Sequence, residues 1–206
     1  MSRVTRATVR DVRWIIEGNH YSKKLPSVSF AWKFIDGDSV VGCMTIGRPA
    51  SPWLGRGICG GKYEQLVWEL NRLVRFPNTV MPLSFYVGMC LRDIGSDMIL
   101  VSYADSGWGH VGKIYQATNW LYTGLTKSRT DIDPGGGKHS RHYSKKDLGN
   151  RKFRSAKHRY VKFLGPNRKK IERFLKYPIL DYPSGVSRRY DTDNPIPSDP
   201  RLLRGK

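Results

Sequence analysis

The chain has 206 residues, which is enough for one domain with a sizeable core and an appendage. Its 36 Lys and Arg against 17 Asp and Glu give a formal net charge of +19, a balance typical of nucleic-acid-binding proteins. No apolar run approaches the roughly 18 residues of a membrane span, and no signal-type apolar segment follows the first residues. Three widely spaced cysteines indicate free thiols in a reducing compartment. We therefore expect a cytoplasmic protein with no membrane partner.

The first quarter of the chain predicts a helix followed by an antiparallel hairpin. Thr8 can cap a helix with a regular apolar face that ends near Gly18. Apolar residues alternate over 30–34, as in a strand, and the polar turn at 36–39 leads to a returning strand over 40–47.

Residues 48–62 are rich in Gly and Pro and predict a long loop, which would serve as a lid or a nucleic-acid contact. The next stretch, 63–75, is ambiguous, because its leucines fit a helix while its apolar and polar residues also alternate as in a strand. Pro82 then falls in the first turn of a helix that ends at Gly95, with Ser84 on the same turn.

Residues 99–124 form the densest cluster of polar and aromatic side chains in the chain. The order predicted here is an apolar strand, a Gly-rich turn, a short helix over 111–119 and a second strand. Asp105 and His110 would meet free backbone N–H groups at the helix start, where an anion or a polarised carbonyl is favoured. The structural alternative is that Asp105 only caps the helix.

Basic residues gather in the C-terminal part, since residues 127–206 hold 22 Lys and Arg against 8 Asp and Glu. A flexible link over 131–137, a basic aromatic segment, a strand over 157–164 and a helix over 167–176 are predicted, followed by a Pro-rich extended tail. The expected parts are a catalytic core (1–127), a basic continuation of the same domain that binds nucleic acid (128–176), and a Pro-rich basic tail (177–206).

The sequence contains no P-loop, no GxGxxG, no nucleophile elbow and no cysteine pair at zinc-finger spacing. What remains is a scattered set of His, Tyr, Ser and carboxylate side chains. Such a set could perform general acid–base catalysis or hold a metal such as iron. Its members are His20, Tyr21, Glu69, Ser84, Asp105, His110 and Tyr115.

Several short motifs follow one another in a characteristic order over roughly residues 10–165. They are His20-Tyr21-Ser22, Pro26-Ser27, Val41-Gly42, Glu69-Leu70-Asn71-Arg72-Leu73, Ser102-Tyr103-Ala104-Asp105, Gly109-His110-Val111-Gly112, Tyr115-Gln116-Ala117-Thr118-Asn119-Trp120 and Lys157-His158-Arg159-Tyr160. This order resembles the phage Mu Mom-like DNA adenine modification proteins, a family related to the GNAT acyltransferases.

The resemblance implies an α+β fold with a GNAT-like central mixed sheet flanked by helices. The sheet would be antiparallel in its first half, two strands would splay around the acyl-donor site, and residues 66–75 would form a strand. One departure concerns the donor, because the usual R/Q-x-x-G-x-G/A pyrophosphate loop is absent between Arg75 and Ser84. Acyl-CoA and aminoacyl-tRNA therefore stand as alternative donors.

The activity that the resemblance implies is modification of adenine N6 in DNA to a carbamoylmethyl adduct, which protects phage DNA from host restriction in the host cytoplasm. Because N6 is paired in a duplex, double-stranded DNA would present a flipped adenine, and tRNA would be a second partner if it carries the donor. The alternatives are a GNAT-like transferase acting on RNA or protein, and a catalytically inactive, basic DNA-binding accessory protein. The oligomeric state stays open, with a dimer among the alternatives.

The resemblance also implies roles for individual residues, with His20 or Asp105 as the base and Tyr21 with Asp105 as ligands of an iron ion. The expected catalytic residues are His20, Tyr21, Ser84, Asp105, His110 and Tyr115, of which Ser84 and Tyr115 would position the donor. The expected cofactor-binding residues are Glu69, Arg72, Tyr103, Gly109, Gly112 and Asn119. The expected nucleic-acid-binding residues are Trp53, Arg56, Trp108, His142, Tyr143, Lys145, Lys146, Arg151, Lys152, Arg154, Lys157, His158 and Arg159.

Overall fold

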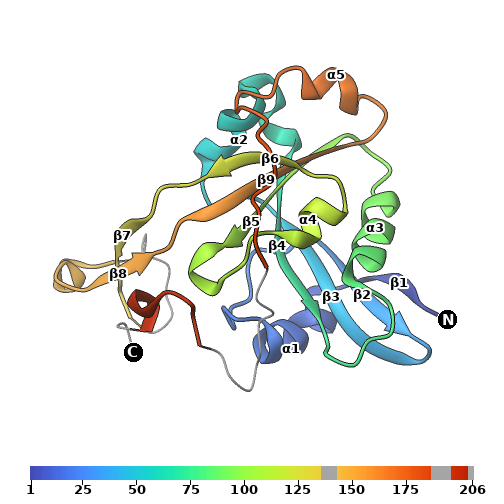
Figure 1. The fold of residues 1–206 in the computed structure, drawn as a ribbon, viewed down its shortest axis with the longest axis horizontal. Coiled ribbons are helices and arrows are strands. Elements are labelled where there is room, and N and C mark those ends of the chain that lie inside the picture. The colour runs from blue at the N-terminus through green and yellow to red at the C-terminus, as the bar shows by residue number, and fades with distance from the viewer. Residues whose placement is uncertain (136–142, 187–195, 204–206) are drawn as a thin grey trace.

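A computed structural model describes residues 1–135, 143–186 and 196–203, and its centre is a seven-stranded sheet in the order β1-β2-β3-β4-β5-β9-β6 (Figure 1). The strands are β1 (Arg3–Ala7), β2 (Phe30–Asp36), β3 (Ser39–Gly47), β4 (Val67–Arg75), β5 (Met98–Asp105), β6 (Leu121–Leu125) and β9 (Lys157–Leu164). The helices are α1 (Val9–Asn19), α2 (Pro52–Cys59), α3 (Leu83–Asp93), α4 (Lys113–Ala117) and α5 (Arg168–Glu172). A two-stranded arm of β7 (Arg129–Ile132) and β8 (Arg151–Arg154) projects from this body (Figure 1).

Neighbouring strands of the large sheet are antiparallel except β4 and β5, which pair in parallel. The parallel pairing is confined to Val67–Glu69 against Ile99–Val101. Beyond this point β4 stays paired with β3, and β5 stays paired with β9, so β4 and β5 part from each other. The predicted mixed sheet, antiparallel in its first half and with two splaying strands, is confirmed. The stretch whose periodicity was ambiguous forms strand β4.

Side chains along a strand alternate between the two faces of the sheet. Helices cover both faces. One apolar cluster joins α3 and α4 to the sheet through Tyr86 and Tyr115. On the other face, α1 packs Ile15 against Cys43 of β3, and Ile58 of α2 packs in a cluster with Ile171 of α5. The catalytic part of the chain therefore rests on a sheet that is buried on both sides.

Several predicted elements are confirmed with small changes in their ends. Thr8 caps α1 in a capping box with Asp11, as the sequence predicts. The helix predicted over 111–119 is shortened to α4, because Gly112 (φ +77°) and Asn119 (φ +57°) adopt left-handed conformations on either side of it. The helix predicted over 167–176 ends already at Glu172 in α5.

The prediction of a long loop over 48–62 is wrong. Residues 52–59 form α2, and a 3₁₀ helix follows at Gly61–Leu66. Pro52 suits the first helical position, where its fixed φ favours the helix and no N–H is needed. Ile58 and Cys59 then bury an apolar face that the glycines of this segment obscure in the sequence.

Three further strands, β1, β7 and β8, were not predicted, and the tail is partly ordered by the sheet. The edge strand β1 lies ahead of α1, and β7 occupies the start of the predicted link. Beyond α5, the backbone N–H of Leu180 donates to Tyr122 (3.0 Å) and the Tyr182 hydroxyl donates to the Trp120 carbonyl (2.7 Å). These contacts fit the predicted extended tail over the surface. Among the described residues, no helix has the length and apolarity that crossing a membrane requires.

Candidate active site

A cavity of about 390 Å³ opens where β4 and β5 part. It is lined by the end of α1, by β4 and β5, by the turn before α4, and by the first residue of β9. Sequence-predicted site residues in the lining are His20, Tyr21, Glu69, Arg72, Tyr103, His110, Gly112, Tyr115 and Lys157. Lining residues that the sequence did not single out include Asn19, Asn71, Arg75, Ser102 and Lys113. The fold thus gathers side chains that lie up to 138 positions apart, from Asn19 to Lys157.

Other predicted residues lie outside this lining. Ser84 is on the first turn of α3, next to the lining residue Leu83, and Gly109 has a left-handed φ of +69° in the preceding turn. Asn119 is exposed, and its carbonyl accepts a hydrogen bond from Lys162 (2.9 Å). The remaining predicted residues outside the lining are Asp105, Trp108 and most of the nucleic-acid set, described below.

His20 is buried immediately after α1, and its hydrogen bonds define its tautomer. The backbone N–H of Ser22 donates to His20 Nδ1 (3.1 Å), and Ser22 Oγ lies 2.9 Å from the same nitrogen. Because a backbone N–H can only donate, Nδ1 accepts and the proton of the neutral ring lies on Nε2. Burial lowers the pKa of His20 well below its usual 6.5, helped by the positive charge of Arg72. The ring is therefore neutral at pH 7 and offers an N–H donor.

Tyr21 lies at the centre of an aromatic group beside His20. Its ring centroid is 4.3 Å from that of His20, 5.3 Å from that of Trp108 and 5.7 Å from that of His110. Burial, and secondly the negative charge of Asp105, raise the pKa of the Tyr21 phenol. Burial also lowers the pKa of His110, although Asp105 opposes this shift. Both groups are therefore neutral at physiological pH, which leaves this wall of the cavity uncharged.

Glu69 is the last residue of β4 that pairs with β5, so its side chain lies where the cavity begins. Burial raises the pKa of its carboxyl group, while the positive charges of Lys157 and Arg72 and a hydrogen bond from the Ala50 backbone N–H oppose the shift. A carboxylate with a raised pKa in the lining of a cavity is suited to accept a proton near neutral pH.

Two neighbours of Glu69 hold the segment that follows α1 on the sheet. Arg72 Nε donates to the Lys24 carbonyl (2.9 Å), and Asn71 Nδ2 donates to the Ser27 carbonyl (2.9 Å). Thr45 fixes the Asn71 amide from the other side by donating to its oxygen (2.7 Å). Residues on β4 therefore position the loop that carries the buried histidine. The sequence did not indicate this role for Asn71.

Asp105 is buried at the end of β5 and has a donor on each carboxylate oxygen. Its Oδ1 accepts from the Gly107 backbone N–H (3.0 Å) and from the Ser155 hydroxyl, and its Oδ2 pairs with Lys157 Nζ (3.1 Å). The Asp105 side chain thus caps the 3₁₀ turn at Ser106–Trp108 and not helix α4, whose N-cap is Gly112, so the structural alternative considered from the sequence named the wrong helix. It also fixes the Lys157 ammonium group, which lines the cavity.

Ser102 and Tyr115 bridge the splayed strands at the inner end of the cavity. Ser102 Oγ on β5 donates to the Leu70 carbonyl on β4 (2.8 Å) and lies 2.7 Å from the Tyr115 hydroxyl. Burial raises the pKa of Tyr115, so the hydroxyl stays protonated. Gly112 is required beside this group, because a Cβ atom there would overlap the Tyr160 ring.

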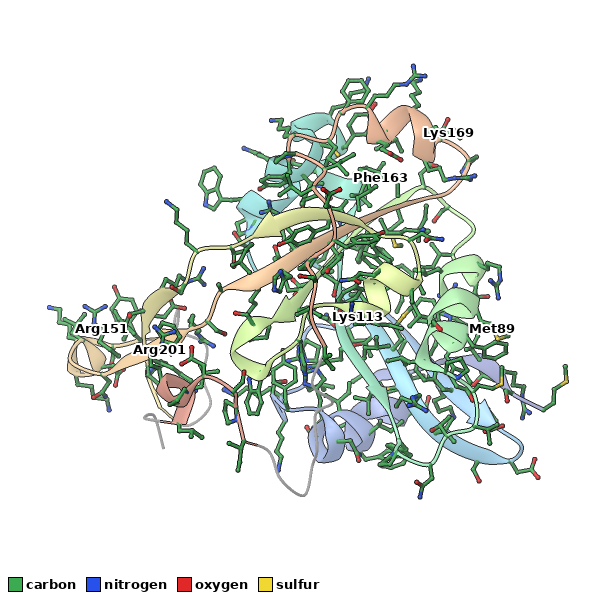
Figure 2. All side chains as sticks on the ribbon, in the orientation of Figure 1. Met89, Lys113, Arg151, Phe163, Lys169 and Arg201 are labelled. Atoms are coloured by element: carbon green, nitrogen blue, oxygen red, sulfur yellow. The ribbon has the colours of Figure 1, made fainter. Side chains whose placement is uncertain are left out.

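The basic residues of the C-terminal part divide into free and engaged groups. Arg151 and Lys152 are on β8, whereas Arg154 pairs with Asp131 (3.3 Å). Figure 2 shows Arg151 on the projecting arm and Arg201, of the C-terminal 3₁₀ helix (Pro200–Leu203), beside it. Three other predicted contact residues, Tyr143, Lys145 and Lys146, are exposed. Two are engaged within the protein: His158 Nδ1 forms a hydrogen bond with the Tyr122 hydroxyl, and Arg159 donates to Thr123 and stacks on Tyr177. His142 lies outside the described residues.

The predicted iron site gains no support from these contacts. In the described ranges, no group of three or more His, Cys, Asp or Glu side chains is arranged to hold a metal. At the predicted ligands, both oxygens of Asp105 have protein donors, and the Tyr21 phenol is protonated. These residues do not fit an iron ion, and we derive no step through a metal.

The topology and the cavity define a class of protein: an α+β protein with a central mixed sheet flanked by helices and a polar site between two splayed strands. The Mom protein family matches residues 2–184, and the chain belongs to this family. No curated protein matches the chain.

Solved structures of acetyltransferases are similar to this chain at low identity. A GNAT-family acetyltransferase from Bacillus cereus ATCC 10987 is 11% identical (TM-score 0.45, 81% of this chain and 99% of that one). An N-acetyltransferase from Staphylococcus aureus Mu50 is 14% identical (TM-score 0.47, 79% and 98%). A GNAT-family acetyltransferase from Elizabethkingia anophelis with acetyl-CoA bound is 11% identical (TM-score 0.41, 79% and 98%). At these values we draw no conclusion on substrate or donor from the likeness.

Proposed function

We propose that this protein is a phage transferase that modifies the exocyclic N6 of adenine in DNA, yielding the carbamoylmethyl adduct that protects DNA from host restriction. The observation that carries this proposal is the cavity at the splayed strands, whose lining includes both a carboxylate of raised pKa and a neutral histidine N–H donor. The net charge of +19 and the exposed basic residues on the arm support a polyanionic partner. The adenine would enter the cavity flipped out of the duplex, since N6 is otherwise paired.

In the proposed reaction the chain's own residues move one proton and stabilise one oxygen. N6 forms a bond to the carbonyl carbon of a glycyl group, the bond from that carbon to its carrier breaks, and the electron pair leaves with the carrier. The N6 proton passes to the Glu69 carboxylate and from there to the departing carrier. This transfer yields an N6-glycyl adenine; attack of the glycyl amine on C6, with the former N6 leaving C6 as the amide nitrogen, would convert it into the isomeric carbamoylmethyl adduct without a further reactant. The Nε2–H of His20 and the ammonium of Lys157 would stabilise negative charge that develops on the acyl oxygen. This assignment replaces the expectation that His20 or Asp105 is the base, because His20 Nδ1 and both Asp105 oxygens are already occupied by donors.

The acyl group and its carrier are separate questions. Acyl-CoA bound through a glycine loop does not fit the segment before α3, because residues 76–82 contain no glycine and two prolines without an N–H. Arg75 Nη1 also turns the Thr79 carbonyl inward (3.0 Å). We therefore derive no step through coenzyme A and propose an acyl donor with aminoacyl-tRNA as the alternative carrier. The residues that line the cavity therefore bear on the acyl group and on the amine that accepts it, and they do not identify the carrier.

The test uses the purified protein with an adenine-containing DNA duplex and either acetyl-CoA, glycyl-CoA or glycyl-tRNA. Nucleosides from the digested DNA are then separated and weighed. A glycyl group bound through its carbonyl and a carbamoylmethyl group are isomers, so a synthetic standard must identify the product by its retention time and fragments. A heavier deoxyadenosine with one donor supports the proposal and names the carrier. If an RNA control is modified while the DNA stays unmodified, the result contradicts the proposal.

A further inference from the structure

A second cavity, of about 630 Å³, lies beside the catalytic one. It is formed by residues 48–53, by Gly55 and Arg56 of α2, by Glu64 and Gln65 ahead of β4, and by Val67 at the start of β4. The backbone N–H of Ala50, in its wall, donates to the carboxylate of Glu69, which lines the catalytic cavity. The hydrogen bond between Ala50 and Glu69 therefore links the walls of the two cavities. We call this second cavity the α2 groove.

An aromatic side chain and two guanidinium groups face the α2 groove. The Trp53 indole is 76% exposed, which leaves a large apolar surface in water. The Arg48 guanidinium stacks 3.7 Å from the ring centroid of Trp68, and its Nη1 donates to the Gln65 carbonyl (2.7 Å). Arg56 Nε pairs with Glu64 (2.6 Å). Each guanidinium group uses only some of its N–H donors in these contacts, so its remaining N–H groups can bind phosphate oxygens.

Positive charge continues from the α2 groove toward α5. Lys62, Arg173 and Lys176 are exposed, and the backbone N–H of Lys176 donates to the Ile58 carbonyl at the end of α2 (2.8 Å). Figure 2 shows Lys169 of α5 projecting at this same end of the molecule. Charges spread along a surface suit a polymer with repeated phosphates better than one small anion. An exposed aromatic ring within such a track is the usual way in which proteins bind unpaired bases.

We propose that the α2 groove binds one unpaired nucleotide of the DNA strand that carries the target adenine, next to that adenine. Its base would stack on Trp53, and the adjoining phosphates would bind Arg48 and Arg56. This inference rests on the proposed function, since it requires DNA as the substrate. It assigns Trp53 to the neighbouring base and not to the flipped adenine, because Trp53 is outside the lining of the catalytic cavity.

The test is the binding of a fluorescently labelled oligothymidylate to the full-length protein, measured by anisotropy. This strand has no adenine, so its binding does not depend on the reaction. We expect Trp53→Ala to weaken binding about tenfold, because one base–aromatic stack is lost, and Trp53→Phe to retain most of the affinity. Trp14→Ala is the matched control, since Trp14 is also exposed (55%) but lies on α1. It should bind as the wild type does.

A second measurement follows the salt dependence of the same binding. Arg56→Gln should reduce the slope of log Kd against log salt by about 0.7, which is the value for one phosphate of a single strand. Thermal unfolding of each variant shows whether it is folded. Equal binding by wild type and Trp53→Ala would overturn the proposal, and so would a tenfold preference for oligouridylate. DNA binding that depends on Trp53, without any adenine modification, would support nucleotide binding by the α2 groove and would refute the proposed function alone.

Discussion

Replacing Gly112 by Ala tests the packing that shapes the cavity, because two separate costs can be worked from the structure. Gly112 has φ of +77°, where an L-residue with a Cβ costs about 1–2 kcal/mol. The new Cβ would also overlap the ring of Tyr160. That ring cannot retreat freely, since the Tyr160 hydroxyl donates to the Val111 carbonyl (2.6 Å) and accepts from Gln116 (3.2 Å). Overpacking of this kind costs about 1–3 kcal/mol.

The expected loss for Gly112→Ala is therefore about 3 kcal/mol, or a fall in Tm of roughly 6–12 °C for a chain of this size. Gly37→Ala is the matched control, because Gly37 also has a positive φ (+59°) but a Cβ there would meet nothing within 4 Å. We expect it to lose only about 1 kcal/mol. Urea unfolding measures both variants without any donor or DNA. Equal losses in the two variants would refute the contact with Tyr160.

Three further predictions concern the polar residues of the site. Glu69→Gln should lower the rate of adenine modification by about 10²–10⁴-fold. In the wild type, the rate should fall with decreasing pH as a group with a pKa above the usual 4.5 protonates. If the Glu69→Gln variant keeps this decrease of rate at low pH, the assignment of Glu69 as the base is contradicted. Asp105→Ala should lower the free energy of unfolding by about 2–4 kcal/mol, because three donors lose their acceptor. A decrease below about 0.5 kcal/mol, measured by urea unfolding, would show that the contacts of Asp105 do not stabilise the fold. His20 has a folded-state pKa below its unfolded value, so its contribution to stability is present above about pH 6.5 and is lost as the pH falls below that value. His20→Asn should flatten this part of the stability curve, and an unchanged curve would refute the shift.

The fold was largely predictable where local patterns determine it. Thr8 with Asp11, the hairpin over 30–47 and the apolar strand β5 each carry a local signal that the tertiary structure does not override. Periodicity could not distinguish helix from strand over 63–75, because β4 is covered on both faces and shows no clean alternation of buried and exposed residues. Helix α2 was missed, since its glycines are typical of loops and its stability comes from tertiary burial.

The site was predictable in its members but not in their contacts. His20, Tyr21, Glu69 and His110 all line one cavity, although sequence distance gave no proof that they converge. The partners of Asp105 could not be foreseen, because Ser155 is 50 residues away and reaches it only through the pairing of β9 with β5. No local pattern encodes such a contact. The role of a carboxylate as base or as positioning group therefore had to come from the structure.

In the proposed function, the exposed basic residues and the α2 groove would make two kinds of contact with a nucleic acid. Residues on the β7–β8 arm, which projects from the body of the protein, suit phosphate contacts along a duplex. The α2 groove is linked to the cavity by the hydrogen bond from Ala50 to Glu69 and suits the strand that is opened around the target base. Together they are consistent with a protein that binds duplex DNA and locally separates its strands.

The most direct test of the central claim is nucleoside mass spectrometry on plasmid DNA from cells that express the protein. Cells supply the donor, so the result does not depend on knowing the carrier. We predict a heavier deoxyadenosine that co-elutes with the carbamoylmethyl standard and that is lost in Glu69→Gln. Unmodified plasmid DNA from cells that contain the folded protein, together with tight and salt-sensitive DNA binding in vitro, would contradict the account and support an inactive DNA-binding protein instead.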